Sequence, residues 1–402
     1  MASNKSAGAR IRCGAAAVIS GLLLAAAIDP AVAQTSSAPD PNNALVRRVR
    51  TELRSFTKWL ETNNARGYIG EVGWPRGEAQ WSQLAEFWFR EADRAGLGVT
   101  VWATGEWWDK GYPLAIYRDR QPGIGVDSAS RGAGVLEAHL GAAVFLRGVN
   151  VAGAEFAAPA VGESEGFSNE TPGVPEKDYH YDTRATFDYL AGRGVRVVRI
   201  PFRWERLQRA PGAPLDPGEL ARLNDVVERA GDSGLKVVLD MHNYGAYYLA
   251  GDSGGVRRPI GSAEVTIQDF AEMWGRISSN FAAVPAVLGY GLMNEPVGLE
   301  AADGVSPAEV WEKASQAALD RIRANGDRKL VFVSGYEWSG VHSWTQNHPD
   351  AWINDPASRF IYEAHHYFDG DYSGTYKRTF AEEALAAARG SARVKVRTGL
   401  SL

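Results

Sequence analysis

The chain has 402 residues, of which 45% are hydrophobic and 23% charged, and its formal net charge is -5 at pH 7. This composition describes a globular protein, and the length suits one large barrel or two ordinary domains. The charge balance is mildly acidic and contains no basic stripe, so we expect neither a nucleic acid nor an anionic membrane as a partner. The 13 Trp residues suit stacking against sugar rings, although indoles also fill ordinary cores.

The first residues have the organisation of an export signal. Lys5, Arg10 and Arg12 are followed by an apolar run over residues 15–28 and by the small-residue pattern of residues 31–33. A spanning helix needs about 20 apolar residues, so we predict a signal peptide over residues 1–33 rather than a membrane anchor. The mature protein would then be secreted, to the periplasm or the medium, and would have no membrane attachment.

The only cysteine, Cys13, lies within this signal. A mature chain without a thiol has no disulfide, no thiolate nucleophile and no cysteine-ligated metal, so its stability must come from a packed core. A polar stretch, residues 34–43, follows the signal and precedes the first periodic segment.

From residue 44 onward, short apolar runs alternate with amphipathic helical stretches, which is the pattern of parallel βα units. The expected strands are residues 67–74, 98–107, 143–151, 195–202, 235–242, 287–295, 329–335 and 359–367. The expected helices are residues 45–63, 79–95, 217–230, 266–281 and 307–324. This number of strands is what a closed (β/α)8 barrel needs, so the predicted fold class is α/β, a TIM barrel. Residues 118–138 are expected to be a connector and residues 158–177 a long loop.

The strongest chemical signal is residues 291–296, which read Gly-Leu-Met-Asn-Glu-Pro at the end of a buried run. In a barrel, the carboxyl ends of the strands face the active site. There Glu295 would protonate a leaving oxygen, and Asn294 would hydrogen-bond the hydroxyl next to the reacting carbon. The alternative is an Asn-Glu helix cap before a proline.

Four motifs together resemble the cellulase-type glycoside hydrolases of family five. They are Arg199 within Val-Val-Arg-Ile-Pro-Phe, His242 within Asp-Met-His-Asn-Tyr, Asn294-Glu295-Pro296, and His365-His366-Tyr367. The resemblance covers most of the chain after the signal. It implies a (β/α)8 fold, cleavage of β-linked glucans or mannans with retention, and catalytic glutamates at the ends of the fourth and seventh strands.

The order of the strands departs from this family. After Tyr367 the usual seventh and eighth strands are missing, yet Gly-Glu-Val-Gly-Trp at residues 70–74 is similar to the seventh and residues 99–108 to the eighth. We therefore predict a circular permutation in one catalytic domain, residues 44–402. Its parts are strands seven and eight (44–117), a connector (118–140), strands one to six (141–383), and a tail (384–402) that begins helically and ends basic and featureless. The competing explanation is a fusion of two partial barrels.

If the barrel closes, Glu71 becomes the nucleophile and faces Glu295, the acid/base, at about 5 Å, the carboxyl spacing of a retaining glycosidase. Arg199 would hold Glu71 ionised, and Tyr367 would donate a hydrogen bond to it. The remaining expected contacts to substrate or catalytic carboxylates are His242, His365, Asn294 and Trp102, the last as the platform under the reacting sugar. Candidate walls of the cleft are Tyr244, Trp107, Trp108, Trp338 and Trp344.

Other polar residues near strand ends receive less weight. Glu106, Glu155 and Glu337 are weaker candidates for contacts to sugar hydroxyls. His365 and His366 are adjacent, and neighbours on a strand point to opposite faces, so they cannot easily share one metal ion. We expect no catalytic metal and no cofactor.

The function predicted from sequence is a secreted, retaining endo-β-1,4-glucanase that acts on a β-glucan polysaccharide or oligosaccharide. Mannan, xyloglucan and mixed-linkage glucan remain open as substrates, because such specificity resides in loops. A non-catalytic carbohydrate-binding barrel would keep the tryptophans without needing either glutamate. A metal-dependent barrel hydrolase would need a His-x-His pair, which does not occur at the strand ends.

Overall fold

The computed structural model of the protein describes residues 38–119, 124–141, 146–162, 164–252, 254–301 and 304–398, with side chains up to residue 390. These residues belong to one compact unit, Ser36–Leu402. The predicted signal peptide, with Cys13, lies outside the described residues. The start of the expected strand 143–151 and the last residues of the expected tail also lie outside them.

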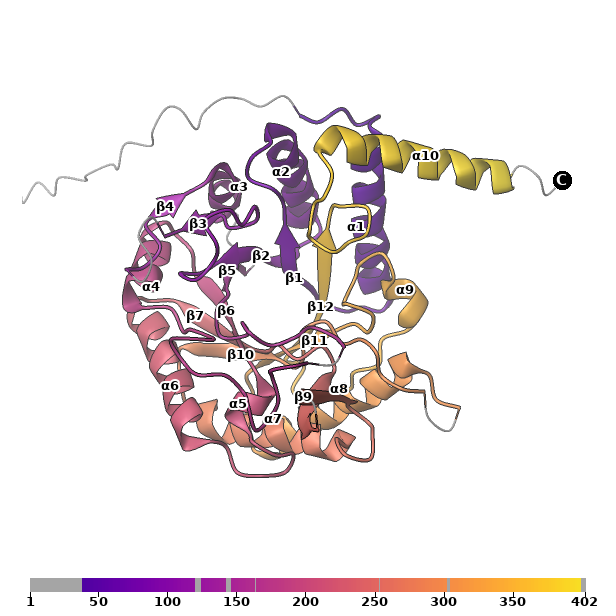
Figure 1. Ribbon diagram of the computed structural model, residues 1–402. Helices are drawn as coiled ribbons and strands as arrows, with labels where there is room; N and C mark the ends of the chain where they lie inside the picture. Colours follow the sequence, from indigo (N-terminus) through magenta and orange to yellow (C-terminus); the bar gives the residue numbers. More distant parts are fainter. Residues whose placement is uncertain are drawn as a thin grey trace, which may run out of the picture. The chain divides into compact units, whose positions relative to one another are not determined.

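Eight parallel strands of the described chain close into a barrel, so the predicted fold class is confirmed (Figure 1). Around the barrel they follow the order β1 (Gly67–Gly73), β12 (Phe360–Tyr367), β11 (Leu330–Ser334), β10 (Val287–Gly291), β7 (Lys236–Met241), β6 (Val197–Phe202), β5 (Arg147–Val151) and β2 (Gly98–Thr104). β1 pairs with β12 and β2 pairs with β5, so the first two strands of the chain close the sheet. The carboxyl ends of all eight strands therefore meet at one end of the barrel.

Helices surround this sheet (Figure 1). The longer ones are α1 (Ala44–Thr62), α2 (Ala79–Arg94), α3 (Arg131–His139), α4 (Arg184–Gly192), α6 (Pro217–Asp232), α7 (Ile267–Phe281), α8 (Pro307–Ala324) and α10 (Phe380–Thr398), and the one-turn helices are α5 (Trp204–Leu207) and α9 (Trp344–Asn347). Local sequence explains several starts. Thr266 and Ser306 begin α7 and α8 with complete capping boxes, and a proline at the first turn helps to start α6 and α8.

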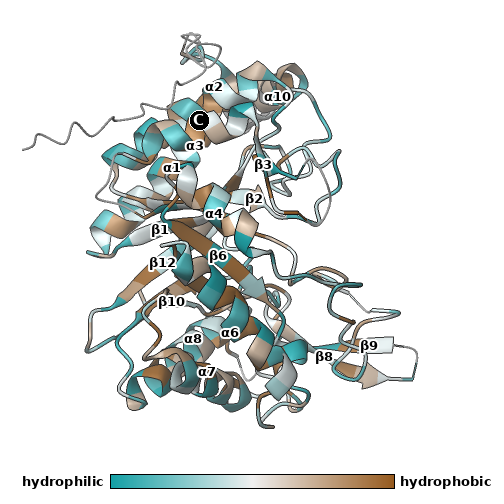
Figure 2. Ribbon diagram, turned by 90° about the vertical axis from the view of Figure 1, so that its left-hand side faces the viewer, coloured by the Kyte–Doolittle hydropathy of each residue, from teal (hydrophilic) through white to brown (hydrophobic). Residues whose placement is uncertain are grey.

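The core lies inside the sheet and between the sheet and the helices. In Figure 2 the strands are largely hydrophobic, while the helices show hydrophilic residues on their outer sides. α1 illustrates the spacing, because Leu45, Val49, Leu53, Phe56 and Leu60 are all buried, as their three- and four-residue intervals predict. These apolar contacts hold the strand ends in fixed positions for the polar residues above them.

Several regions differ from the expected elements, among them α4, which no expected helix covers. The connector contains α3, which was not predicted because Gly132 and Gly134 lower its helix propensity. In the structure, the buried side chains of Val135 and Leu136 anchor this helix in the core. α10 extends to Thr398, so the helical start expected for the tail continues further than predicted. An antiparallel hairpin of β8 (Ala246–Gly251) and β9 (Gly254–Pro259) stands after β7, where no strand was predicted.

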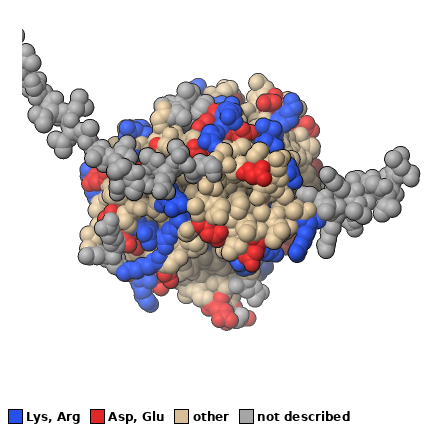
Figure 3. Space-filling view, turned by 90° about the horizontal axis from the view of Figure 1, so that it is seen from above, with Lys and Arg blue, Asp and Glu red and all other residues tan. Residues whose placement is uncertain are grey.

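The outer surface of the described unit carries charges of both signs. Figure 3 shows Lys and Arg side chains interspersed with Asp and Glu on the face seen from above. No helix within the described ranges combines the length and apolar character that a membrane span requires.

Candidate active site

A cavity of about 540 Å³ opens at the carboxyl ends of the strands. Its lining includes the sequence-predicted residues Glu71, Trp102, His242, Tyr244, Glu295, Trp338, His365 and Tyr367. These residues come from β1, β2, β12 and the segments that follow β7, β10 and β11. Residues separated by up to about three hundred positions in the chain therefore share one site.

Two glutamates face each other in this cavity. Glu71 lies in β1, and Glu295 follows β10. One carboxylate oxygen of each, together with a ring nitrogen of His365, lie within 4.8 Å of one another. His365 Nδ1 is 2.7 Å from Glu295 Oε1 and 3.7 Å from Glu71 Oε2. The imidazole therefore connects two carboxylates whose spacing is that of a close catalytic pair.

The carboxylate of Glu71 is held at both oxygens. Arg199 Nη1 donates to Oε1 at 3.1 Å, and the hydroxyl of Tyr367 donates to Oε2 at 2.7 Å. Glu71 is 3% exposed, so these donors replace most of the water that would otherwise solvate its charge. The two bonds fix the direction in which the carboxylate faces the cavity.

Glu295 occupies a different environment. Burial raises the pKa of its carboxyl, and the hydrogen bond from His365 only partly offsets that effect. Its backbone adopts φ 46°, a left-handed conformation that non-glycine residues rarely adopt. Tyr244 supports this turn, because its amide donates to the carbonyl of Asn294 at 3.1 Å.

His365 is a cation in this setting. Burial alone would lower the pKa of its imidazole, but Glu71, Glu295 and Glu363 outweigh burial and raise the pKa to about 10. Both ring nitrogens then donate, Nδ1 to Glu295 at 2.7 Å and Nε2 towards Glu363 at 3.4 Å. The positive charge lies between the two facing glutamates.

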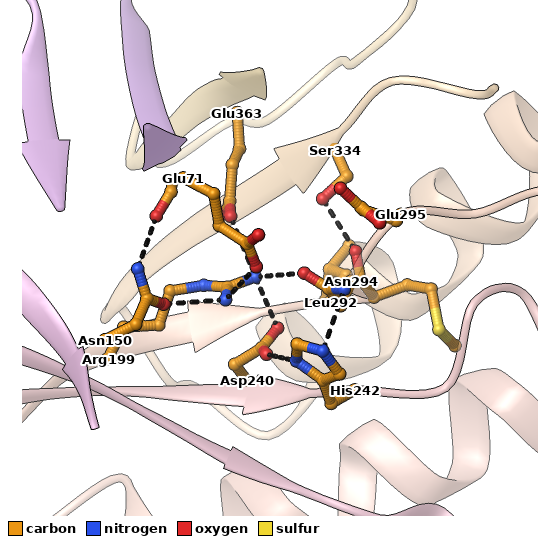
Figure 4. A network of polar contacts seen from close by, with 12 residues as sticks. Glu71, Asn150, Arg199, Asp240, His242, Leu292, Asn294, Glu295, Ser334 and Glu363 are labelled. Atoms are coloured by element: carbon orange, nitrogen blue, oxygen red, sulfur yellow. Dashed lines mark hydrogen bonds and ion pairs between the residues drawn. The ribbon is translucent and has the colours of Figure 1, made fainter. Parts of the chain in front are cut away.

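Arg199 is the centre of a buried network below the cavity (Figure 4). Its guanidinium contacts Asp240 at 2.9 Å and Glu363 at 3.1 Å, besides Glu71. Arg199 Nη2 also donates to Asn294 Oδ1 at 2.8 Å. Below Glu71 the network is closed to solvent, since Arg199, Asp240 and Glu363 are 0% exposed. One guanidinium therefore holds carboxylates from β1, β7 and β12 together.

Sequence reasoning missed Asp240 and Glu363, although a signal for them exists. In the predicted strands, each stands two positions before a predicted histidine, His242 or His365, and residues i and i+2 of a strand share a face. Gly70 provides the space for Glu363, because a Cβ at Gly70 would lie 2.0 Å from Glu363 Oε1. The Gly-Glu pair of β1 is thus explained by its neighbour as well as by catalysis.

His242 is neutral and orients Asn294. Burial lowers the pKa of its imidazole well below the ordinary value. Its Nδ1 lies 2.8 Å from Asp240 Oδ2 and donates to it, so Nε2 accepts the amide of Asn294 at 3.1 Å. Trp102 stacks on the same imidazole, with ring centroids 5.7 Å apart. This arrangement leaves the Trp102 ring half-buried at the cavity.

The other predicted walls are placed differently. Trp344 is 1% exposed and packs at 4.8 Å from Phe56 and 5.4 Å from Trp59, so its prediction as a cleft wall is wrong. Trp344 begins α9 and faces α1, a contact between distant segments that the sequence alone does not predict. Trp107 stacks on His180 and Trp108 on Tyr112, and neither lines the cavity described above.

The three weaker glutamate candidates form internal contacts. Glu106 Oε1 accepts hydrogen bonds from the backbone and hydroxyl of Thr183 and from the hydroxyl of Thr186, each at 2.7 Å. Glu155 accepts the amide of Gly153, and burial raises the pKa of its carboxyl to about 7. Glu337 is exposed and accepts the side-chain amide of Asn347 at 2.8 Å.

Two groups of side chains in the described residues have the spacing of metal ligands. They are Glu71, Glu295 and His365 in the cavity, and Glu106, His180 and Asp182 beside β2. Hydrogen bonds and ion pairs among protein groups already account for most of their contacts: His365 bridges the first group, and His180 Nε2 lies 3.0 Å from Glu106 in the second. In the second group, Asp182 Oδ2 is buried and has no hydrogen-bond partner among the described residues.

The fold and the site define a (β/α)8 barrel with a close pair of carboxylates at the carboxyl ends of its strands, the arrangement of glycoside hydrolases. The model of the cellulase family, glycosyl hydrolase family 5, matches residues 151–396. This match spans more than half of the chain, so the protein belongs to that family. β1 and β2, with Glu71 and Trp102, precede the matched region.

Similar proteins are endoglucanases by name. The chain is 30% identical over 236 residues to endoglucanase gh5-1 of Neurospora crassa, which covers 57% of this chain and 52% of that protein. It is 28% identical over 243 residues to the manganese dependent endoglucanase Eg5A of Phanerodontia chrysosporium, covering 59% and 56%. Endoglucanase Cel5A of Pseudomonas stutzeri, solved with cellobiose, is 37% identical, with coverage of 59% and 63% and a TM-score of 0.48. The match therefore spans little more than half of these relatives.

Proposed function

We propose that the protein is a retaining endo-β-1,4-glucanase in which Glu71 is the nucleophile and Glu295 the acid/base. The observation that carries this proposal is the pair of facing carboxylates, whose nearest oxygens lie within 4.8 Å. Retaining enzymes have carboxyl groups about 5–5.5 Å apart, whereas inverting enzymes leave about 6.5–9.5 Å for a water molecule. The close pair therefore favours covalent catalysis.

The two glutamates take complementary roles in the first step. Glu295, with its raised pKa, begins protonated and gives its proton to the glycosidic oxygen. Glu71 attacks the anomeric carbon, so that a glycosyl-enzyme ester forms as the bond to the leaving sugar breaks. In the second step Glu295 takes a proton from water, which displaces Glu71 and restores the original configuration.

The surrounding residues orient these groups. Arg199 and Tyr367 hold Glu71 in its attacking direction, and the cationic His365 lies against Glu295. We assign Asn294 to the hydroxyl adjacent to the reacting carbon, with His242 fixing its amide. Trp102 provides the apolar face on which the reacting sugar stacks.

The substrate proposal follows the relatives, which are named as endoglucanases. Trp102, Tyr244 and Trp338 give the cavity aromatic surfaces suited to sugar rings. Mannan, xyloglucan and mixed-linkage glucan are the alternatives within the same chemistry. We also propose that residues 1–33 direct export, because a secreted enzyme meets polysaccharide outside the cell.

We further propose that the chain is circularly permuted relative to its family. β1 and β2 precede the family-matched region, yet in the barrel they lie between β12 and β5. Every family strand is then represented once in a single closed sheet, which supports permutation over a fusion of two incomplete barrels. Neighbouring first and last strands make this rearrangement inexpensive, because a short connector spans the gap.

The test is hydrolysis of carboxymethylcellulose by the full chain beside Glu71→Gln and Glu295→Gln variants. An endo-acting enzyme lowers viscosity faster than it releases reducing ends, and we expect both variants to abolish this activity while keeping the wild-type circular dichroism. Parallel assays on mannan, xyloglucan and mixed-linkage glucan assign the preferred glycan. A folded wild type that cleaves none of these polymers would contradict the proposal.

A further inference from the structure

The cavity has a second wall, formed by the loops that follow β11 and β12. The first loop contributes Trp338 and His342, and the second contributes Asp371 and Tyr372. β2 and β12 are the two neighbours of β1, so Trp102 and this wall lie on opposite sides of Glu71. With the reacting sugar on Trp102, a leaving group that continues past Glu71 would meet this second wall.

We propose that His342, held in a stack on Tyr372, binds the sugar unit on the leaving side of the scissile bond. This inference rests on the proposed function and deepens it. The ligand is the β-linked glucose unit that leaves when Glu295 protonates the glycosidic oxygen. The same unit can return as an acceptor. His342 thus determines how well a saccharide serves as leaving group or acceptor.

His342 presents unused hydrogen-bonding groups to the cavity. Its side chain is exposed, and among the described residues no hydrogen-bond partner lies within reach of either ring nitrogen. Partial burial lowers the pKa of the imidazole, so the neutral ring offers one donor and one acceptor at neutral pH. Sugar hydroxyls both donate and accept, and they match this pair. Trp338, 37% exposed, supplies an apolar surface in the same wall.

The imidazole is also held in place before substrate arrives. The rings of His342 and Tyr372 are nearly parallel, 6° apart, with centroids separated by 3.7 Å. The hydroxyl of Tyr372 donates to Glu52 Oε1 at 2.8 Å, and Glu52 Oε2 lies 3.1 Å from His366 Nε2. A side chain fixed in this way loses little freedom on binding.

Glu52 gives α1 a role in the cleft. α1 lies outside the family-matched residues 151–396, yet its carboxylate fixes Tyr372 and, through the stack, His342. Arg48, one turn earlier in α1, lies 5.3 Å from the centroid of the Tyr372 ring. The helix before β1 therefore acts on the leaving-group side through a chain of contacts, with Tyr372 as a positioning residue.

The experiment compares two substrates that share a glycone but differ in their leaving groups. We would measure kcat/KM of wild type, His342→Ala, Tyr372→Phe and Gln346→Ala on cellotetraose and on 4-nitrophenyl β-cellobioside. Gln346 is exposed in α9, directly after this loop, and does not line the cavity, so it is the matched control. Tyr372→Phe keeps the ring but removes its bond to Glu52.

In the His342→Ala variant we expect the ratio of kcat/KM for cellotetraose to that for the aryl cellobioside to fall about tenfold, the size of a hydrogen bond lost from the sugar alone. Tyr372→Phe should lower this ratio less, and Gln346→Ala should leave it unchanged. With aryl cellobioside as donor and cellobiose as acceptor, the yield of cellotetraose relative to hydrolysis should fall in the same order.

Two outcomes are distinguishable from each other. If wild type cleaves both substrates and His342→Ala changes neither the ratio nor the acceptor yield, the inference is overturned while the proposed function stands. If wild type cleaves neither substrate nor carboxymethylcellulose, the proposed function itself fails and the inference falls with it.

Discussion

Two segments of the chain build one site, and they differ in how they relate to the family. The family-matched segment, residues 151–396, supplies Arg199, Glu295 and His365. The N-terminal segment, residues 44–117, lies outside that match and supplies Glu71 and Trp102. Because β1 pairs with β12, both segments meet at the same end of the barrel. The chemistry therefore depends on neighbourhood in the closed sheet rather than on order along the chain.

The two segments are joined in two contrasting ways. At the active site, Arg199 contacts Glu71, a buried junction of charges. Beside β2, Glu106 accepts hydrogen bonds from Thr183 and Thr186 at the start of α4, and it pairs with His180. The first junction positions the proposed nucleophile, and the second holds the loop after β2. Substitutions at the two junctions should differ in the size and the pH dependence of their effects on stability.

The largest effect on stability is expected at the charged junction. Arg199→Met leaves three buried carboxylates, those of Glu71, Asp240 and Glu363, without their guanidinium. Removing one partner of a buried ion pair typically costs about 3–5 kcal/mol, and we expect a loss of that size in the free energy of unfolding, measured by urea titration. Arg184→Met, on the exposed ion pair with Asp188, is the control and should change nothing measurable.

The junction at Glu106 should have a smaller effect with a characteristic pH dependence. We expect Glu106→Gln to lower the free energy of unfolding by about 1–3 kcal/mol without changing kcat, because no catalytic group contacts it. Hydrogen bonds to His180 and Thr183 outweigh burial and lower the pKa of Glu106 from 4.5 to about 2. Its stabilisation is therefore present above pH 4.5 and is lost as pH falls towards 2. Identical pH profiles of stability for wild type and Glu106→Gln between these values would refute this account.

A pH profile sharpens the assignment of Glu295. Glu295 must be protonated to donate, so activity falls as pH rises through its pKa, and burial places that alkaline limb above the range of an ordinary glutamate. The cationic His365 lowers this pKa through its hydrogen bond. His365→Asn should therefore move the alkaline limb of kcat/KM to higher pH. A limb that moves down or stays in place would assign it to another group.

The smallest effect is expected from metal removal. Protein charges already pair the cavity group Glu71, Glu295 and His365. We therefore expect the same kcat on carboxymethylcellulose before and after dialysis against EDTA, and no gain on adding manganese. Loss of activity in EDTA that manganese restores would instead assign a divalent cation to this family member.

Much of the barrel could be predicted because each strand has a recognisable local sequence pattern. The expected strand 287–295 contains β10, Val287–Gly291, and the expected helix 307–324 is α8 to the residue. The Asn294-Glu295-Pro296 motif and the Gly-Glu pair of residues 70–71 both lead to the cavity. The local pattern predicts which face of each strand is buried and where the strand ends, and therefore the direction of its side chains.

The remainder depends on contacts between distant segments. Trp344 and Trp338 are six residues apart and equally aromatic, yet one fills the core against α1 and the other lines the cleft. The burial of the Asp240 and Glu363 carboxylates is explained only by their ion pairs with Arg199. Such partners are chosen by the three-dimensional packing, which a single sequence does not contain.

The most direct test of the central claim is covalent labelling of the nucleophile. Wild type would be incubated with 2,4-dinitrophenyl 2-deoxy-2-fluoro-β-cellobioside, whose fluorine slows hydrolysis of the glycosyl-enzyme ester, and its peptides mapped by mass spectrometry. We predict one label, on Glu71, with none in the Glu71→Gln variant. A label on a carboxylate of the family-matched segment, or an active enzyme that takes no label, would contradict the assignment of the N-terminal strand as the source of the nucleophile.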